Sequence, residues 1–350
     1  MTRSHGAALA DAVQRNCHIA DARHGADLSM CIYLLQMREF YRWEQRIAPL
    51  QSLPHGPLGA WLAGREALWQ SLEGREYERL SIAGQAFDPF DLAGINARLQ
   101  GQGLVYGAGL IGPGRASFFL GELDSVQQRA AARLVVSGHE HARGLSAPPA
   151  VLAGSTIYLR QDALKRWLWQ TFESWTLKSP GGAFRCALDC HGYAADGPLA
   201  LERMAGVQGE TLVLHELGEL AAGELLGPLW QELRAGLECR RTELYLRCVR
   251  DHLADCLVTL PRLLELDATG SIHFWFSNLE GVRAQLFPRL TRAYASWHAG
   301  DGGQALTQVL SSGRSHWLDL GHKALRLFAR RGPAATPEIR RLLESAPARH

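Results

Sequence analysis

The feature that most limits the fold is a stretch of strand-forming sequence in a chain whose other patterns are largely helical. Residues 103–123 read GLVYGAGLI, GPG and RASFFLGEL, so glycines supply a turn between two segments rich in aromatic and β-branched residues. Two more short strand candidates follow, ARLVVSG at 132–138 and STIYLR at 155–160. We therefore expect a mostly helical α+β fold, with a small central antiparallel or mixed sheet and helices before and after it.

Helical periodicity predicts the elements around this sheet. The segment from Leu28 to Trp43 is apolar nearly all the way round and predicts a buried helix, and LPHGPLG at 53–59 predicts a loop. The glycine-rich stretch 179–209 predicts a long, functional loop. Helices are expected over 7–48, 60–80, 89–100, 162–175, 210–226, 228–237, 241–265, 277–298, 303–311 and 315–331, with the ordered core ending at 328–333.

The expected domain organisation follows these patterns in chain order. It consists of an N-terminal helical region (1–101), a hairpin and small sheet (102–160), a helical region with the candidate metal site (161–335) and a C-terminal tail (336–350).

Composition limits the classes of protein that the chain can belong to. Its 350 residues are 47% hydrophobic and 21% charged, which is typical of a folded protein with a substantial core. Apolar runs such as CIYLL at 31–35 are too short to cross a bilayer, and the N-terminus lacks the pattern of a secretory signal. Seven cysteines without CxxC pairing argue against a disulfide framework. These features predict a soluble, cytoplasmic protein, and a net charge of +2 gives no reason to expect a nucleic acid or a membrane as partner.

The strongest candidate for chemistry is LVLHELGELAAGE at 212–224. His215 and Glu219 are four residues apart, so in a helix both side chains reach the same ion. Apolar residues on both sides of this helix predict that it is buried. Because a buried histidine and carboxylate need partners, a metal ion is one way to provide them.

The VLHELGEL sequence, preceded by strands, a helix and a loop, resembles the HExxH turn of the zincin metalloproteases. The resemblance implies that His215 is the first metal ligand and Glu216 the general base. Glu219 stands where the second histidine should be, and a carboxylate ligand shifts the preference from zinc towards iron or manganese. The resemblance also implies a third ligand some twenty to thirty residues downstream. Glu243 lies at that distance, and His252 lies on the opposite margin of the apolar face of the same helix; helical phase does not choose between them.

Three functions remain open at this stage. The leading hypothesis is a metal-dependent hydrolase with one divalent ion, zinc or iron, that acts on a small-molecule or peptide substrate. The first alternative is a non-haem iron oxidoreductase with one or two irons, in which His18, His24 and Glu39 add to the ligand set. The second is a non-catalytic binding or scaffold protein, in which Glu216 and Glu219 pair with arginines.

Three other clusters are weaker candidates for metal ligands. His139 and His141 are two residues apart in SGHEHARG, so in an extended chain they point the same way and Glu140 points opposite. In the N-terminal region, His18 and His24 belong to a series spaced by three residues, and Glu39 continues a nearby helical stripe, as in a carboxylate-histidine site between helices. The third cluster, Cys186 and Cys190 with His191, we interpret as structural thiols.

Residues 17–44, CHIADARHGADLSMCIYLLQMREFYRWE, resemble the opening of an uncharacterised bacterial protein family. That resemblance implies no activity. The sequence has no phosphate-binding GxxxxGK[ST], no dinucleotide-binding GxGxxG after a strand and no GxSxG nucleophile elbow.

Overall fold

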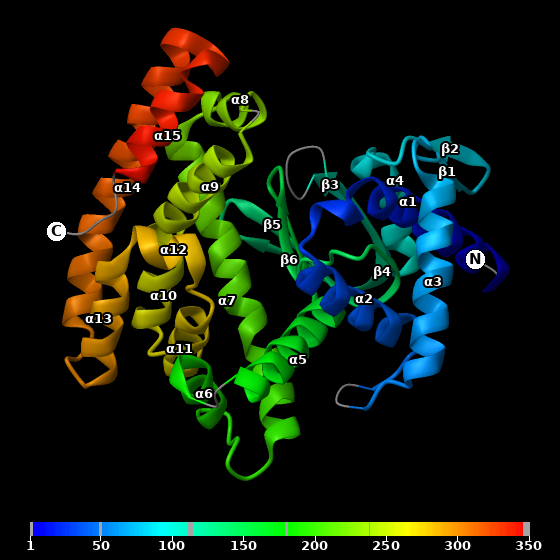
Figure 1. The fold of residues 1–350 in the computed structure, drawn as a ribbon, viewed down its shortest axis with the longest axis horizontal. Helices are drawn as coiled ribbons and strands as arrows, with labels where there is room; N and C mark the ends of the chain where they lie inside the picture. The colour runs from blue at the N-terminus through cyan, green and yellow to red at the C-terminus, as the bar shows by residue number, and fades with distance from the viewer. Residues whose placement is uncertain (1–2, 49–50, 111–114, 179–180, 238, 346–350) are drawn as a thin grey trace. The chain divides into compact units, whose positions relative to one another are not determined.

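The computed structural model describes residues 3–48, 51–110, 115–178, 181–237 and 239–345. These residues form two compact units, which we describe separately. The first comprises Met1–Arg129 and Arg133–Lys178, and the second Ala130–Ala132 and Ser179–His350. The described residues are 67% helical, and the predicted mostly helical α+β class is confirmed (Figure 1). Among the described helices, none has the length and apolar character needed to cross a membrane.

A five-stranded mixed sheet is the framework of the first unit. Its strand order is β3-β4-β5-β7-β6, with β3 antiparallel to β4, β7 parallel to β5 and β6 antiparallel to β7. The register of β3 and β4 pairs Leu104 with Glu122 and Leu110 with Ala116, which confirms the predicted hairpin. The GPG sequence expected at its turn lies outside the described residues. The strands are β3 Leu104–Leu110, β4 Ala116–Arg129, β5 Ala132–Arg143, β6 Ala150–Ala153 and β7 Thr156–Arg160, and a separate antiparallel pair is β1 Leu80–Ile82 with β2 Gln85–Phe87.

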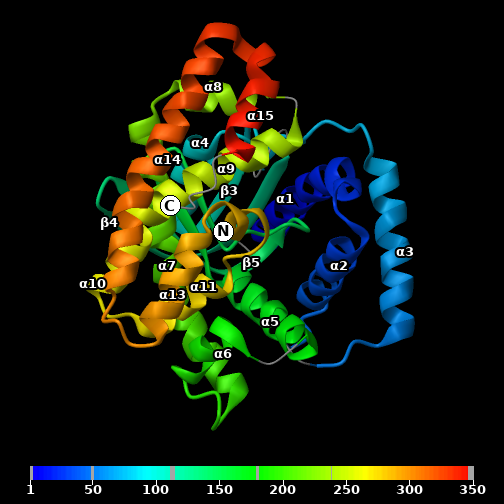
Figure 2. The same cartoon turned by 60° about the vertical axis from the view of Figure 1, so that its left-hand side comes forward.

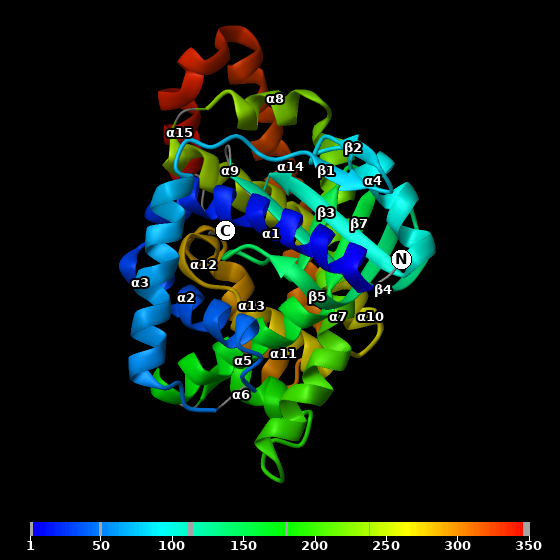
Figure 3. The ribbon, with the colours of Figure 1, turned by 90° about the vertical axis from the view of Figure 1, so that its right-hand side faces the viewer.

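Helix α1 packs against the sheet of the first unit (Figure 3). Val13 and Cys17, four residues apart on α1, are fully buried in a cluster with Phe118 of β4. Removing such apolar surface from water is the main force that holds the layers together. The helices of this unit are α1 Arg3–His24, α2 Met30–Glu44, α3 His55–Leu72, α4 Leu92–Leu99 and α5 Gln161–Lys178, with 3₁₀ turns at Gly25–Asp27 and Gln100–Gln102.

Two expectations for the N-terminal helices are wrong. The first half of α2 is not buried, since Met30 is 70% and Ile32 47% exposed, and only its last turns reach the core. Apolar composition alone does not supply a neighbour for every face of a helix. The predicted loop at 53–59 is also shorter than expected, because α3 begins at His55, and α3 ends before Gly74, whose φ of +76° is incompatible with a continuing helix.

The second unit is helical, and it corrects the prediction of a long loop at 179–209. Helices α6 and α7 occupy most of that stretch, and Asp196 caps α7 by accepting a hydrogen bond from the backbone N–H of Leu199. Gly206 and Gly209 lie inside α7, which tertiary packing holds in place, whereas Gly192 lies in the turn between α6 and α7. The helices are α6 Gly182–Asp189, α7 Gly197–Leu226, α8 Leu229–Ala235, α9 Arg240–Ala254, α10 Leu260–Glu265, α11 Thr269–Ser277, α12 Gly281–Leu286, α13 Pro288–His298, α14 Gln304–Arg331 and α15 Thr336–Glu344, with a π-helical turn at Asp255–Thr259 and a 3₁₀ turn at Gly332–Ala335.

Other helix boundaries in this unit also differ from the predictions. The predicted helix 241–265 is confirmed as a continuous run, but a π-helical turn at Asp255–Thr259 joins α9 to α10. The two helices expected at 303–311 and 315–331 are one helix, α14, which packs beside α13 and α9 (Figure 2). The chain remains ordered past Pro333, since α15 buries Ile339 and Leu343.

Gly218 brings α7 and α9 close together. A Cβ atom at this position would lie 2.6 Å from the carbonyl oxygen of Ala254, much closer than real Cβ atoms approach a backbone oxygen. The HELGE sequence of α7, residues 215–219, therefore lies directly against the end of α9, where the π-helical turn begins.

We predict that Gly218→Ala destabilises the protein by about 1–3 kcal/mol, because the added methyl group meets backbone that cannot rotate away. Gly206→Ala, in the same helix but with open space around its Cα, is the matched control, and it should be neutral or stabilise by up to about 1 kcal/mol. Thermal and urea unfolding of both variants test this. Equal effects at the two positions would contradict the close packing at Gly218.

Candidate functional site

The HELGE turn of α7 meets α9 in a group of three potential metal ligands. His215 and Glu219 come from α7, as the four-residue spacing predicted, and Asp251 comes from α9. One ligand atom from each lies within 4.8 Å of the other two. This convergence of one imidazole and two carboxylates is the candidate site.

Asp255, the first residue of the π-helical turn, fixes the orientation of His215. His215 Nδ1 lies 2.9 Å from Asp255 Oδ1, so its Nε2 faces Glu219 Oε1 at 3.6 Å. Asp255 is fully buried and also accepts hydrogen bonds from Trp275 Nε1 at 3.1 Å and from Arg283 at 2.6 Å. A carboxylate behind the imidazole is the arrangement that commonly orients a metal-binding histidine.

Arg250 contacts the other side of the group. Its guanidinium donates to the carboxylate of Glu219 and lies 3.3 Å from Asp251 Oδ1. The arginine therefore supplies positive charge to the same two carboxylates that an ion would use. A metal ion at this site has to share these carboxylates with Arg250 or displace it.

Burial and charge shift the pKa values in this group. Burial opposes the charged form of His215, but Asp255 and Glu219 outweigh it and hold its pKa well above the usual value. Burial and the neighbouring Glu219 raise the pKa of Asp251, and they raise that of Glu216 to about 7. The pKa of Glu219 falls to about 2 despite burial, because His215 and Arg250 stabilise its charged form. Two adjacent buried carboxylates thus compete for positive charge, which a proton, an arginine or a metal ion can supply.

The two predicted third ligands, Glu243 and His252, do not belong to this group. Glu243 is buried in an ion pair with Arg247, at 3.0 Å, and with Arg234. His252 is fully buried, stacks on Trp317 with ring centroids 4.8 Å apart, and its Nε2 lies 3.0 Å from the carbonyl oxygen of Arg283. Burial and Arg283 lower the pKa of His252 to about 3, so it is a neutral core residue. The residue that faces His215 and Glu219 is Asp251, which directly precedes His252.

The side chains of His139, Glu140 and His141 alternate between the two faces of β5, as predicted. His139 and His141 lie on one side of β5 with ring centroids 5.3 Å apart, and each also faces a carboxylate, Asp162 at 3.5 Å and Glu122 at 3.8 Å. Glu140 points to the opposite face, where it is buried and accepts a hydrogen bond from Arg160 at 2.5 Å. Within the described residues these side chains do not form a three-ligand group, and Glu140 is a buried ion-pair partner.

The fold does not bring the N-terminal candidates His18, His24 and Glu39 together into one group of ligands. His18 is buried against Arg65, with Nε2 2.6 Å from the guanidinium, and burial and Arg65 lower its pKa to about 3. His24 faces Asp27 at 3.5 Å, and Glu39 pairs with Arg42 at 3.1 Å. Among the described residues, these three contribute to no candidate metal group. The geometry therefore gives no support to a second iron in this region.

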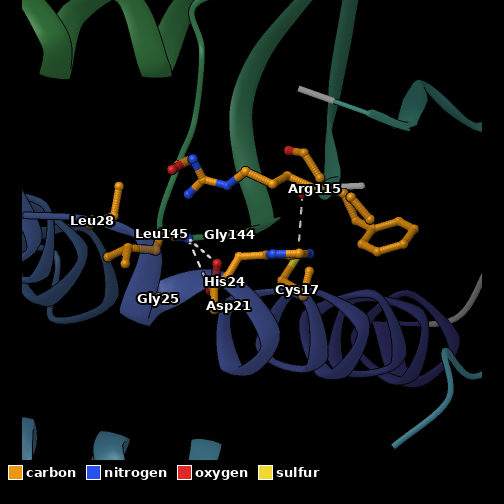
Figure 4. A pocket seen from close by; sticks show the side chains of 13 residues that line it. Cys17, Asp21, His24, Gly25, Leu28, Arg115, Gly144 and Leu145 are labelled. Carbon is orange, nitrogen blue, oxygen red and sulfur yellow. Dashed lines mark hydrogen bonds between the residues drawn. The ribbon is translucent and has the colours of Figure 1, made fainter. Parts of the chain in front are cut away.

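A small cavity lies beside α1 in the first unit (Figure 4). Asp21 and His24 line it from α1, facing Arg115 and the 144–146 segment. Both oxygens of the Asp21 carboxylate accept from the backbone N–H of Leu145 at 3.0 Å. Burial raises the pKa of Asp21 to about 7, although this hydrogen bond opposes the shift. At about 20 Å³ the cavity has room for a water molecule and not for a substrate.

A second group of potential ligands comprises Cys186, His273 and His298. Cys186 was a weak candidate from the sequence, whereas neither histidine was predicted to belong to a site. Their positions in the sequence carry no signal, because 87 and 25 residues separate the three and only the packing of α6, α11 and α13 joins them. The same holds for Asp251, since sequence alone does not show which side of α9 faces α7.

Comparison with known protein families covers both units. Residues 8–160 match the N-terminal domain of a family of unknown function, DUF6866, and residues 165–346 match its C-terminal domain. The chain belongs to the DUF6866 family. The prediction of an uncharacterised family is confirmed, and neither match is to a zincin metalloprotease. Searches of curated proteins and of solved structures find no match.

We predict that Asp255→Asn destabilises this DUF6866 protein by about 3–5 kcal/mol, because it leaves the partly buried His215 and Arg283 without their fully buried counter-charge. The measurement is urea unfolding followed by Trp fluorescence. Asp319→Asn, at an exposed ion pair with Lys323, is the control and should change stability by less than about 1 kcal/mol. A loss below 1 kcal/mol for Asp255→Asn would contradict the central role of this carboxylate.

The stability of the N-terminal unit of this DUF6866 protein should depend on pH through Asp21. The folded pKa of Asp21, about 7, lies above the usual aspartate pKa of 3.8, so the folded state binds the proton more tightly than the unfolded state. The resulting stability is fully present below about pH 4 and is lost as the pH rises through about 7. Asp21→Asn keeps an acceptor for Leu145 and should flatten this part of the profile in melting experiments between pH 4 and 8. A variant with the slope of the wild type would show that Asp21 does not cause it.

Proposed function

We propose that this protein is a metal-dependent enzyme that binds one divalent ion through His215, Glu219 and Asp251 and catalyses a hydrolytic reaction. One observation carries the proposal: ligand atoms of His215 and Glu219 on α7 and of Asp251 on α9 converge to within 4.8 Å of one another. The orientation of His215 is fixed by its contact with Asp255. His215 Nε2 faces Glu219 Oε1 at 3.6 Å, and the carboxylate of Asp251 lies beside the same point. A divalent ion balances those carboxylates in a way that one arginine does not.

The donor set favours a particular group of metals. One imidazole and two carboxylates are harder ligands than the two histidines of the HExxH turn, so iron and manganese suit the site at least as well as zinc. The ion would polarise a substrate carbonyl or phosphoryl oxygen and lower the pKa of a bound water. Because His215 must be neutral to bind, metal affinity should rise with pH.

Glu216 is the residue we assign to proton transfer. It follows His215 on α7 and lies close enough to Glu219 for their charges to interact. Its pKa of about 7 suits a group that accepts a proton at neutral pH. A general base with this pKa is half protonated near pH 7, so the rate of hydrolysis should rise as the pH increases through neutrality.

A second candidate function, a mononuclear non-haem iron oxidoreductase, draws on the same ligands. The observation in its favour is the carboxylate-rich donor set, which suits iron. The metal that remains bound, together with its visible and paramagnetic spectra, separates the two functions. A non-catalytic protein remains the outcome if Arg250 alone neutralises the carboxylates.

We predict that Asp251→Asn weakens metal binding at this site at least tenfold relative to the wild type, since it removes a ligand. Glu243→Gln is the matched control, because Glu243 is a buried carboxylate on the same helix with arginine partners and should leave affinity unchanged. The measurement is titration with Zn²⁺ and, without oxygen, Fe²⁺, followed by elemental analysis. Equal metal content in Asp251→Asn, His215→Ala and the wild type would rule out the proposed site.

Glu216→Gln separates metal binding from catalysis. The variant should keep the metal content of the wild type and lose at least a hundredfold in turnover of model ester, amide or phosphate substrates. Any substrate that the wild type hydrolyses serves for the comparison. A rate unchanged by Glu216→Gln would argue against Glu216 as the base.

A further inference from the structure

The group of Cys186, His273 and His298 lies in the second unit on helices other than those of the His215 group. One sulfur or nitrogen atom from each residue lies within 4.8 Å of the other two. Cys186 comes from α6, His273 from α11 and His298 from the end of α13. Three helices thus bring one thiol and two imidazoles to the same point.

Tyr294 orients His273 within this group. The hydroxyl of Tyr294 lies 2.7 Å from His273 Nδ1, which leaves Nε2 as the nitrogen available to an ion. The rings of His273 and His298 meet edge to face, with centroids 5.3 Å apart. A hydrogen bond to the distal nitrogen of a histidine is the usual way in which a protein prepares an imidazole for metal binding.

A second observation comes from the end of α6. Cys190 lies one turn after Cys186, and the Nε2 atom of the adjacent His191 is buried without a hydrogen-bond partner among the described residues. Gly270 faces both residues: a Cβ atom there would lie 3.2 Å from Cys190 Cβ and 3.3 Å from His191 Nε2. Since Gly270 is one turn before His273 on α11, more sulfur and nitrogen donors border the group.

We propose that Cys186, His273 and His298 form a zinc site, separate from the His215 group. Thiolate and imidazole are the ligands that zinc prefers, whereas magnesium, calcium and manganese prefer oxygen. Zinc lies about 2.3 Å from sulfur and about 2.0–2.1 Å from nitrogen, so its tetrahedral ligand atoms are roughly 3.4–3.6 Å apart. Atoms that already lie within 4.8 Å of one another therefore need to close by at most about 1.4 Å. The fourth position is open to water. The proposal is independent of the function proposed above.

Cobalt substitution tests this site specifically, because a thiolate bound to Co²⁺ gives charge-transfer absorption in the near ultraviolet. The His215 group contains no thiol and cannot produce this signal. The full-length reduced protein is titrated with Co²⁺ and then with Zn²⁺. We expect the absorption in the wild type and in His215→Ala, and we expect Zn²⁺ to abolish it.

The variants are Cys186→Ser and His298→Ala, and Cys239→Ser, a partly exposed thiol at the start of α9, is the matched control. Cys186→Ser should abolish the absorption, His298→Ala should weaken Zn²⁺ affinity at least tenfold, and Cys239→Ser should behave as the wild type. Circular dichroism checks that each variant folds, and His298, which is exposed, can be replaced without opening the core. Absorption that persists in Cys186→Ser, or its absence from the folded wild type, would overturn the proposal.

Discussion

The fully buried carboxylate of Asp255 organises the second unit. It accepts hydrogen bonds from side chains on three other helices, α7, α11 and α12, at distances of 2.6 to 3.1 Å. A charge with no exposure to water is stable only where such partners surround it. Because His215 and Arg283 approach the same carboxylate, the positions of their helices are coupled through one residue, and the close contact of α7 with α9 at Gly218 depends on this arrangement.

The negative charge of two neighbouring carboxylates has to be balanced in the His215 group. Glu219 and Asp251 are adjacent and mostly buried, and Arg250 contacts both of them. In the first unit, the buried carboxylate of Glu140 is instead balanced by two arginines, Arg160 and Arg143. What distinguishes the His215 group is an imidazole that can change its charge, whereas the guanidinium groups around Glu140 remain charged at any ordinary pH. This difference makes the His215 group a candidate for chemistry, whereas the Glu140 group is a structural ion pair.

Sequence patterns predicted those features that depend on neighbours along the chain. The hairpin at β3 and β4 followed from its glycines and alternating residues, and the shared face of His215 and Glu219 followed from helical spacing. The third ligand and the Cys186 group were not predictable, because they depend on which helices pack together. The stretch 179–209 was wrongly predicted as a loop because α7 contains glycines in its first half, and glycine content alone does not distinguish a packed helix from a loop.

The π-helical turn at Asp255–Thr259 acts as a single-residue insertion in an otherwise regular helix. A regular helix advances about 100° per residue, so the same number of residues in a regular helix, without the wide turn, would rotate everything that follows relative to α9. Leu260 and Leu263, which are buried in the core of the second unit, would then point elsewhere. The wide turn between Asp251 and Pro261 is therefore itself a structural constraint: a relative with the same number of residues but a regular helix there would lose either this core packing or the placement of the Asp255 carboxylate.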